Sequence, residues 1–340
     1  MKLNNISFTY VFVLIVIFQN CEAFARILPG RPTDWFEGIT FYADNHGFFA
    51  NEANVADRDA SEIVGLELTD SSLETCTALA GRYTNVVALK WTSKRTDPLP
   101  SLILAATNFP KLRYLDFFVT NAVGMPASMS TLTNLTGLIA IGISGPSLTN
   151  IDSSIYDLGN LREMWFKLKS AGLPDGISKL KHLKSLMISG KRQIEFGKLP
   201  SDINSSTLEA MEIYNIKDVE ARMPTLPSNL VELVLSGCPL HEIPQSWSSN
   251  RCLQFCTLTQ CGLTNFPSQL PEIVTLKFLN LDLNKIIWIP PLNLRGDRQI
   301  EISLWANPIK RIAPENQDLV KEGKLEYDGD GQTNRVTHFY

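Results

Sequence analysis

A pattern of leucines that returns at a regular interval is the feature that most constrains how this chain can fold. It is clearest in residues 230–240, 253–263 and 276–286, which carry apolar residues at positions 1, 4, 6 and 11 and Asn or Cys at position 9. Self-similarity of this kind, with a period between about 20 and 50 residues, is typical of repeat architectures. The length of 340 residues would otherwise suggest about two globular domains, and the repeat replaces that estimate.

The pattern L-x-x-L-x-L-x-x-N/C-x-L extends over eleven units and resembles the leucine-rich repeat family, whose units have about 20 to 29 residues. The spacing of the units falls inside this range, since they start at Ile63, Val86, Leu112, Leu135, Leu161, Leu183, Leu208, Leu230, Leu253, Leu276 and Gln299. The resemblance therefore covers residues 63–312. It implies an α/β solenoid, a horseshoe with parallel β-strands on its concave face and short helices, 3-10 turns or loops on its convex side.

Each unit is expected to contain one short strand. In such a strand Leu186 and Ile188, at positions 4 and 6, point inward, whereas positions 3, 5 and 7 face outward because successive side chains alternate. Between strands, a proline followed by an apolar residue, as at Pro174 and Ile177, predicts a helical turn on the outer arc. No unit buries its apolar face alone, so stability is expected to come from stacking neighbouring coils.

The residue type at position 9 of each unit predicts how regularly neighbouring coils stack. In the family this residue is Asn, Cys or Thr, whose side chain bonds the backbone of adjacent loops. The last four units carry Cys238, Cys261, Asn284 and Asn307 there, and the first seven carry Ser71, Lys94, Thr120, Ile143, Lys169, Lys191 and Ile216. Among these seven, only Thr120 and Ser71 offer similar hydrogen-bonding groups. We therefore expect the N-terminal half to be less regular.

The N-terminal segment, residues 1–25, has the pattern of a secretory signal peptide. An apolar run from Phe8 to Phe18 is followed by Ala23-Phe-Ala25, which places small residues before a cleavage point at Arg26. A spanning helix needs about 20 apolar residues, more than this run supplies, although an uncleaved membrane anchor remains the alternative. The C-terminal region has no hydrophobic stretch of the kind that a lipid-anchor signal requires. We expect a secreted, extracellular protein.

Caps are expected to cover both ends of the solenoid, because the terminal coils would otherwise expose their apolar faces. Residues 26–62 are the expected N-terminal cap, and 313–340 are the expected C-terminal cap and polar tail. Within the first, Trp35-Phe-Glu-Gly38-Ile-Thr-Phe41 is similar to the N-terminal cap of plant-type extracellular repeats, but it lacks the two flanking cysteines.

Five cysteines remain after the leader, so at least one thiol is expected to be free or intermolecular. Cys252 and Cys256 would lie about 13 Å apart along a strand, which is too far for a disulfide. Cys238 and Cys261 hold equivalent places in adjacent coils, about 5 Å apart. This spacing permits either two thiols that each bond the backbone or a disulfide between them.

Composition and motifs argue against several function classes. The net charge is −4 and the pI is near 5.7, so the chain lacks the basic footprint of a nucleic-acid-binding protein. No G-x-S-x-G, G-x-x-x-x-G-K-[ST] or H-E-x-x-H motif occurs, and the four histidines show no metal-ligand spacing. We expect no enzymatic activity, no cofactor and no metal.

The resemblance implies a receptor-like protein that recognises a protein or peptide through its concave face; a structural or matrix protein without a specific ligand is the alternative. The expected ligand-binding residues are Tyr114, Asp116, Phe118, Glu163, Trp165, Lys167, Met187, Glu212 and Tyr214. Trp165 is the expected anchor, and Ile139 and Ile141 are also expected to face outward. A second outward aromatic group contains Phe255, Phe278 and Trp305. The sequons at Asn134 and Asn204 predict a glycoprotein.

Overall fold

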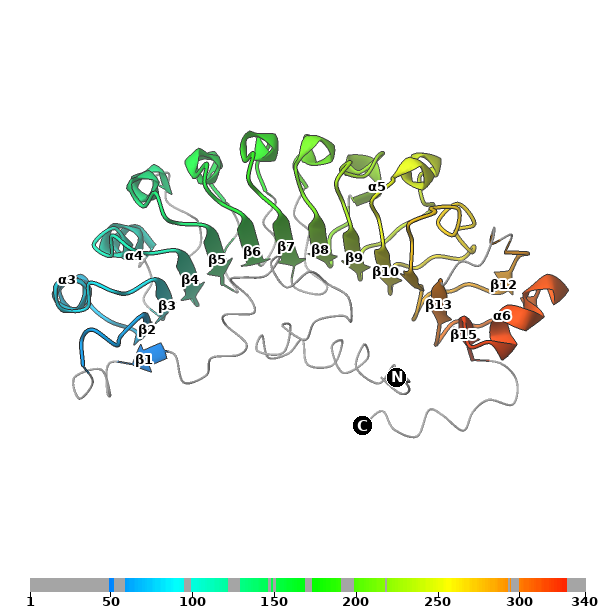
Figure 1. The fold of residues 1–340 in the computed structure, drawn as a ribbon, viewed down its shortest axis with the longest axis horizontal. Coiled ribbons are helices and arrows are strands. Elements are labelled where there is room, and N and C mark those ends of the chain that lie inside the picture. The colour runs from blue at the N-terminus through cyan, green and yellow to red at the C-terminus, as the bar shows by residue number, and fades with distance from the viewer. Residues whose placement is uncertain are drawn as a thin grey trace.

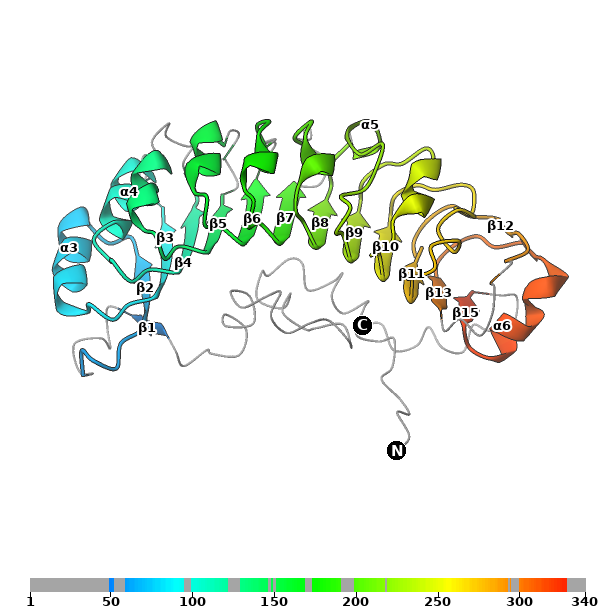
Figure 2. The same ribbon diagram turned by 45° about the horizontal axis from the view of Figure 1, so that its top comes forward.

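The computed structural model describes residues 49–51, 59–94, 99–121, 129–145, 148, 151–168, 173–190, 199–217, 219–292, 294 and 300–328. These residues form a curved solenoid in which each coil places a strand on the inner side of the curve and a helix or turn on the outer side (Figure 1). The strands lie side by side along the whole arc (Figure 2). The expected signal peptide, the Trp35 motif and the tail from residue 329 lie outside the described residues.

One parallel sheet of thirteen strands, in chain order, runs through the described residues. Its strands are β1 (Phe49–Asn51), β2 (Gly65–Thr69), β3 (Ala88–Ser93), β4 (Tyr114–Val119), β5 (Ala140–Ser144), β6 (Glu163–Leu168), β7 (Ser185–Gly190), β8 (Ala210–Tyr214), β9 (Glu232–Ser236), β10 (Phe255–Thr259), β11 (Phe278–Asn280), β13 (Glu301–Leu304) and β15 (Leu325–Tyr327). Eleven of them belong to the eleven units, which confirms the solenoid. The first and last lie in the segments expected to be caps.

The outer side carries short helical elements. They are α3 (Leu73–Arg82), α4 (Leu99–Ala106), η3 (Met129–Asn134), η4 (Ser153–Asp157), η5 (Ile177–Lys179), η6 (Ile203–Ser205), α5 (Val219–Arg222), η7 (Gln245–Ser249), η8 (Pro314–Asn316) and α6 (Gln317–Lys321). The Oγ of Ser72 caps α3 by accepting a hydrogen bond from the Thr75 N–H at 3.1 Å. Two further short strands, β12 (Trp288–Ile289) and β14 (Arg311–Ile312), pair in parallel near the C-terminal end.

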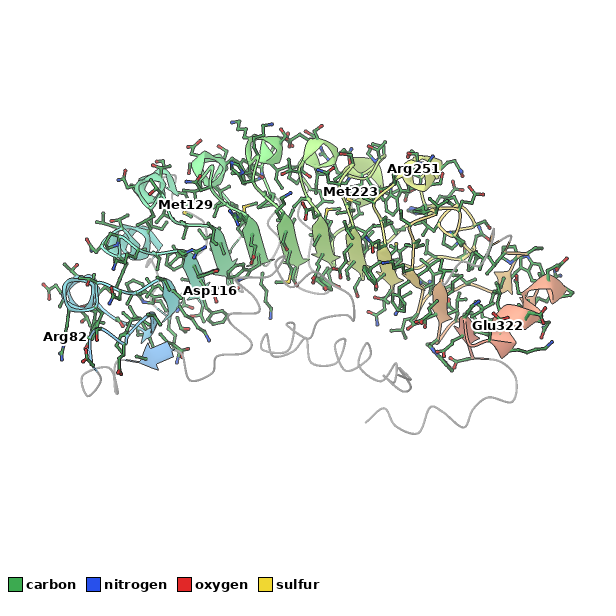
Figure 3. The ribbon with its side chains drawn as sticks, viewed as in Figure 1. Arg82, Asp116, Met129, Met223, Arg251 and Glu322 are labelled. Atoms are coloured by element: carbon green, nitrogen blue, oxygen red, sulfur yellow. The ribbon has the colours of Figure 1, made fainter. Side chains whose placement is uncertain are left out.

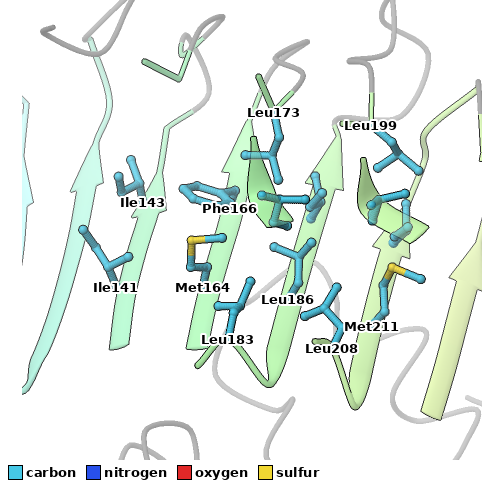
Figure 4. Close-up of a cluster of buried hydrophobic side chains, with 14 of the residues drawn as sticks. Ile141, Ile143, Met164, Phe166, Leu173, Leu183, Leu186, Leu199, Leu208 and Met211 are labelled. Atoms are coloured by element: carbon cyan, nitrogen blue, oxygen red, sulfur yellow. The ribbon is translucent and has the colours of Figure 1, made fainter. Parts of the chain in front are cut away.

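The hydrophobic core is one continuous column along the solenoid. The position-4 and position-6 residues of successive coils stack in it, as Met164, Phe166, Leu186 and Met211 do in Figure 4. These side chains are all at most 1% exposed. Because each coil supplies only one layer, its burial depends on the coil on either side, as expected for a solenoid.

The fourth unit starts further along the chain than the sequence pattern predicted. In the sheet, Ile141 of β5 pairs with Leu115 of β4 and with Met164 of β6, which are both position-4 residues. The first position of this unit is therefore Leu138 and not Leu135. With this start, the spacings to the neighbouring units stay within the range of the others.

This shift corrects three residue assignments. Ile141 was expected to point outward on the concave face, and Ile143 was expected at position 9. Both are completely buried core residues. Ile139, also expected to face outward, is half-buried at position 2. The reason is local: η3 ends at Asn134, so Asn134 and Leu135 close the outer arc although they match the Asn-apolar pair that precedes other strands.

The position-9 residues of the last four units form the expected ladder. The Nδ2 of Asn284 donates to the carbonyls of Leu258 and Leu281, each at 2.7 Å, and its Oδ1 accepts from the Cys261 N–H at 3.0 Å. Asn307 repeats the arrangement one coil later. The ladder therefore ties each of these coils to the one before it.

Cys238 and Cys261 continue this ladder as free thiols. The Cys238 Sγ donates to the Ile213 carbonyl at 3.4 Å, and the Cys261 Sγ donates to the Leu235 carbonyl at 3.5 Å. Burial raises the pKa of the Cys238 thiol to about 12, so the neutral form that donates these bonds is favoured. Of the two alternatives, the structure thus contains the pair of thiols.

The backbone conformation of the turn after each strand differs between the two halves of the solenoid. Position 8 has a left-handed backbone conformation in the first unit and in the last five, at Asp70, Asn215, Gly237, Gln260, Leu283 and Ala306. In β3 and β4 the strand instead continues through position 8, at Ser93 and Val119. The half with the ladder is therefore also the half with a uniform turn.

Candidate binding face

The concave face is built by the alternation of side chains in the strands. Core residues point to one side of the sheet, and positions 3, 5 and 7 point to the other, so Asp116 lies on the inner side of the curve while Arg251 lies on the outer side (Figure 3). The parallel register aligns equal positions of successive units at about 4.8 Å. The central column consequently contains Asp116, Gly142, Trp165, Met187 and Glu212 in this order.

Trp165 is held in place by the neighbouring strand. Its indole lies over Gly142 of β5: a Cβ atom at Gly142 would be only 1.9 Å from the indole Cε2 and Nε1. The half-buried ring also belongs to a small cluster on this face that contains Tyr114, Ala88 and Ala140. Because Gly142 has no side chain, the Trp165 indole can pack directly over its backbone; we call this position the seat of the indole.

The remaining expected residues all stand at outward positions, but their exposure differs. Phe118 is exposed at 38%, because it pairs with the small residues Thr92 and Ser144 on either side. Asp116, Lys167 and Met187 are half-buried, and Tyr114, Glu163, Glu212 and Tyr214 are buried. The face is consequently a packed surface with few protruding side chains.

Two of the expected site residues are hydrogen-bonded to each other. The Tyr214 hydroxyl donates to Glu212 Oε2 at 2.8 Å. Both residues lie on β8, two positions apart, and their side chains therefore share the same side of the strand. This bond fixes the orientation of the phenol ring at the end of the expected site.

A second group of side chains gathers at the C-terminal end of the concave face. Phe255 and Phe278 stand opposite each other on β10 and β11. Trp305, directly after β13, is half-buried; its backbone N–H donates to Asp282 Oδ1 at 2.8 Å and its indole N–H to Glu326 Oε2 at 3.2 Å. The aromatic residues were expected here, but the two carboxylates were not.

Of these two carboxylates, only Asp282 had a recognisable sequence signal. Asp282 occupies outward position 7 of the tenth unit, and Glu326 lies on β15, which continues the sheet beyond the last unit that the leucine pattern identifies. Burial raises the pKa of Asp282 to about 6, although the Ser303 hydroxyl donates to Asp282 Oδ1 at 2.6 Å and lowers it in part. Both residues are part of the same surface as Trp305.

The two sequons differ in accessibility. Asn134 is exposed at the end of η3 on the outer side of the solenoid. Asn204 is half-buried in η6; its Oδ1 is shielded from solvent, and its Nδ2 lies 3.5 Å from the Arg222 carbonyl. Glycosylation at either residue stays a prediction, for which Asn134 has the more accessible amide.

Within the described ranges, no three or more His, Cys, Asp or Glu residues are grouped so that they could hold a metal ion. In the same part of the chain, no helix combines the length and apolar character needed to cross a membrane.

No protein-family model and no curated protein matches the sequence. Solved structures match by fold. The plant peptide hormone receptor RGFR1 in complex with RGF2 has a TM-score of 0.54 and 19% identity over 78% of this chain and 44% of that one. The TLR13–ssRNA13 complex has a TM-score of 0.50 and 16% identity over 80% of this chain and 48% of that one. The chain thus spans less than half the length of either.

At these levels of sequence identity, the matches show a shared fold and nothing more. This fold agrees with the repeat pattern in the sequence. The parallel sheet in chain order, the stacked core and the position-9 ladder are its physical signs. The chain is therefore a leucine-rich repeat solenoid.

Proposed function

We propose that this chain binds a protein or peptide partner through the concave surface of β4 to β8. We call this surface the Trp165 strip; it contains Tyr114, Asp116, Phe118, Glu163, Trp165, Lys167, Met187, Glu212 and Tyr214. The observation that carries the proposal is the seating of the Trp165 indole on Gly142 at the centre of this surface. Aromatic side chains are enriched at interface centres, where a few residues supply most of the binding energy.

The fixed indole favours binding because it is already ordered. A partner that packs on Trp165 does not have to immobilise a freely rotating ring, which reduces the entropic cost of association. Met187, next in the same column, has a flexible thioether that adapts to irregular surfaces, and Phe118 offers an exposed ring nearby. The strip thus combines a rigid anchor with adaptable contacts.

The structural neighbours support this class of function. RGFR1 is a peptide hormone receptor whose structure contains RGF2. Together with the signal-peptide pattern of residues 1–25, this likeness supports a secreted chain that acts outside the cell. The alternative is a structural or matrix protein that has this fold and no specific ligand.

Affinity capture with matched variants tests the proposal. The secreted chain from Arg26, its Trp165→Ala variant and the control Leu104→Ala serve as baits in native extracellular fluid, and quantitative mass spectrometry compares the captured proteins. Leu104 is 54% exposed on α4 of the outer side. We expect the native chain and the control to capture one partner equally. Trp165→Ala should lower the affinity for this partner about thirtyfold, as for a hot spot of about 2 kcal/mol.

Circular dichroism melting of each bait shows whether it is folded. If all three folded baits capture the same proteins equally, the Trp165 strip is not a binding site, and the matrix alternative is favoured. If Trp165→Ala unfolds, Met187→Ala replaces it in the same comparison. Met187 is half-buried and stands next to Trp165 in the central column.

A further inference from the structure

A small patch of apolar and basic side chains lies outside the main sheet, near the C-terminal end of the solenoid. We call it the Trp288 patch; it contains Lys285, Ile287, Trp288, Lys310 and Arg311. β12 and β14, which carry Trp288 and Arg311, pair with each other and not with the thirteen-stranded sheet. β12 lies farther from the inner side of the curve than β13 does (Figure 2). The patch is therefore separate from the Trp165 strip.

Two apolar side chains of the patch are accessible. Ile287 is 51% exposed, and Trp288, next to it, is half-buried. The N–H groups of Lys310 and Arg311 both donate to the Ile287 carbonyl, at 2.9 and 3.3 Å, so the two segments lie side by side. An accessible apolar surface rimmed by charged residues is a feature of interaction sites. The patch thus offers a partner an apolar contact.

The guanidinium of Arg311 has a defined position. It lies over the Trp288 ring, with its Cζ 4.5 Å from the ring centroid, while the residue remains exposed. A guanidinium that packs by its flat face on a ring keeps its N–H edge available for two parallel hydrogen bonds to a carboxylate. Because the pairing of β12 and β14 fixes both backbones and the ring holds the side chain, binding costs less conformational entropy.

Positive charge is concentrated around this guanidinium. Lys285 and Lys310 are exposed beside it. The two segments that form the patch, residues 284–291 and 307–313, contain three cations and neither Asp nor Glu. The equivalent segment of the preceding coil, residues 262–266, is uncharged. In a chain whose net charge is −4, these segments are a local excess of positive charge that attracts anionic groups.

The two features together favour an acidic peptide segment over other anions. A carboxylate with an apolar side chain next to it can contact Arg311 and Ile287 at the same time. A sulfated polysaccharide has no apolar side chain to cover Ile287, and three cations release few counterions from a polyanion. Lipid surfaces are bound by clusters of four or more basic residues or by larger apolar faces.

We propose that the Trp288 patch is a second docking site, which binds an acidic segment of a protein partner. A Glu or Asp carboxylate binds the Arg311 guanidinium, and the apolar side chain next to it packs on Ile287. Lys285 and Lys310 attract the segment and increase the rate of association. This site goes beyond the proposed function of the concave face and shares no residue with the Trp165 strip.

Three short peptides test the two parts of the patch. The probes are acetyl-Ala-Glu-Leu-Glu-Ala-amide, a neutral counterpart with Gln in place of Glu, and a polar counterpart with Ser in place of Leu. Each is added to the secreted chain from Arg26 labelled with ¹⁵N-tryptophan, and Trp288→Phe assigns the indole N–H resonance of Trp288. We expect the acidic peptide to shift this resonance saturably. The Gln peptide should need about tenfold higher concentration, and the Ser peptide about threefold higher.

Variants of exposed residues separate charge from apolar contact. Arg311→Gln should weaken the acidic peptide about tenfold, and Arg311→Lys should restore only part of this loss, because the ammonium lacks the planar fork. Ile287→Ser should remove the preference for the Leu peptide over the Ser peptide. Lys277→Gln is the matched control, since it removes an exposed cation that precedes β11 in the same coil, and it should have no effect.

Circular dichroism melting shows whether each variant is folded. If Arg311→Gln unfolds, the double variant Lys285→Gln and Lys310→Gln replaces it and should weaken the acidic peptide about threefold. Equal binding of the acidic and Gln peptides, a shift that does not saturate, or native affinity in Arg311→Gln would each overturn the proposal.

Two further probes separate the other classes of anion. A heparin fragment that binds more tightly than the acidic peptide and equally well to Ile287→Ser would overturn the proposal in favour of a polyanion site. Vesicles of phosphatidylcholine and phosphatidylserine at about 7:3 that displace the peptide would overturn it in favour of a lipid surface. Trp165→Ala should bind the acidic peptide with native affinity, so failure of the Trp165 strip is distinguishable from failure of this site.

Discussion

At the scale of single residues, the most informative contact is the one between Gly142 and Trp165. Substitution of the glycine by alanine places a methyl group where the indole now lies, since the added Cβ would be 1.9 Å from two ring atoms. The ring must therefore leave its seat. We expect Gly142→Ala to lower the free energy of unfolding by about 1–3 kcal/mol and to weaken partner binding as strongly as Trp165→Ala.

Urea unfolding and the capture assay measure the two effects. Gly159→Ala is the matched control, because an added Cβ there has no neighbour within 4 Å. The seat of the indole on Gly142 would be refuted if Gly142→Ala and Gly159→Ala had the same stability and the same binding.

The raised pKa of Asp282 predicts how the stability of the folded chain depends on pH. Burial raises its pKa in the folded chain to about 6, above the value of about 3.9 for an exposed aspartate. The folded state thus binds a proton more tightly than the unfolded state, so this residue makes the chain more stable as pH falls from about 7 to 4. At pH 7, keeping this carboxylate charged in the folded chain costs up to about 3 kcal/mol.

Asp282→Asn keeps the oxygen that accepts from Ser303 and Trp305 and removes the charge. Compared with the native chain, we expect the variant to be more stable at pH 7 by about 1–2 kcal/mol, and to lose this advantage near pH 4.5. Urea midpoints at pH 4.5, 5.5 and 7 give the comparison. A difference that is constant with pH would show that Asp282 titrates in its ordinary range.

At the scale of elements, the two halves of the solenoid are joined by different bonds. The coils of β9 to β13 are tied by Cys238, Cys261, Asn284 and Asn307. After β4, Thr120 makes a long bond at this position, from its Oγ1 to the Ser93 carbonyl at 3.4 Å, and after β8 Ile216 is apolar. Amides that are held by cross-coil bonds open less often. We expect the strand amides of β9 to β13 to exchange hydrogen more slowly than those of β4 to β7.

Hydrogen exchange followed by mass spectrometry measures this difference. Some coils of the middle region are connected by other means: Asp202 accepts the N–H groups of Gly176 and Ser178 at 3.0 and 2.9 Å, and Asp175 accepts that of Ser201. Equal protection in both halves would mean that such aspartates replace the ladder fully.

The sequence predicted the elements better than their exact starting points. Within one strand, inward residues are two apart, so a local pattern is sufficient to identify them. The fourth unit was ambiguous because Leu132, Leu135 and Leu138 follow one another at equal intervals and all are buried. Only the pairing of β5 with β4 and β6 decides which one opens the strand, and this pairing is a tertiary contact.

At the scale of the whole molecule, export is the prediction that the sequence makes without the fold. The apolar run from Phe8 to Phe18, followed by Ala-Phe-Ala, predicts cleavage after Ala25. We expect the intact mass of the protein in the culture medium to correspond to a chain that begins at Arg26, with any added mass removed by a glycosidase that cleaves N-linked sugars. A membrane-bound product that keeps residues 1–25 would contradict export.

The sequence by itself determined the solenoid, because its repeated apolar residues can be buried only by stacking equal units. It also determined which residues are outward, apart from those of the fourth unit, since alternation in a strand is a local property. The tertiary structure alone decided how those residues behave. Gly142 contacts Trp165 of the next coil, and Asp282 is buried where it accepts hydrogen bonds from Ser303 and Trp305 of the next coil. Both effects depend on distances between coils, which the order of residues within one coil does not fix.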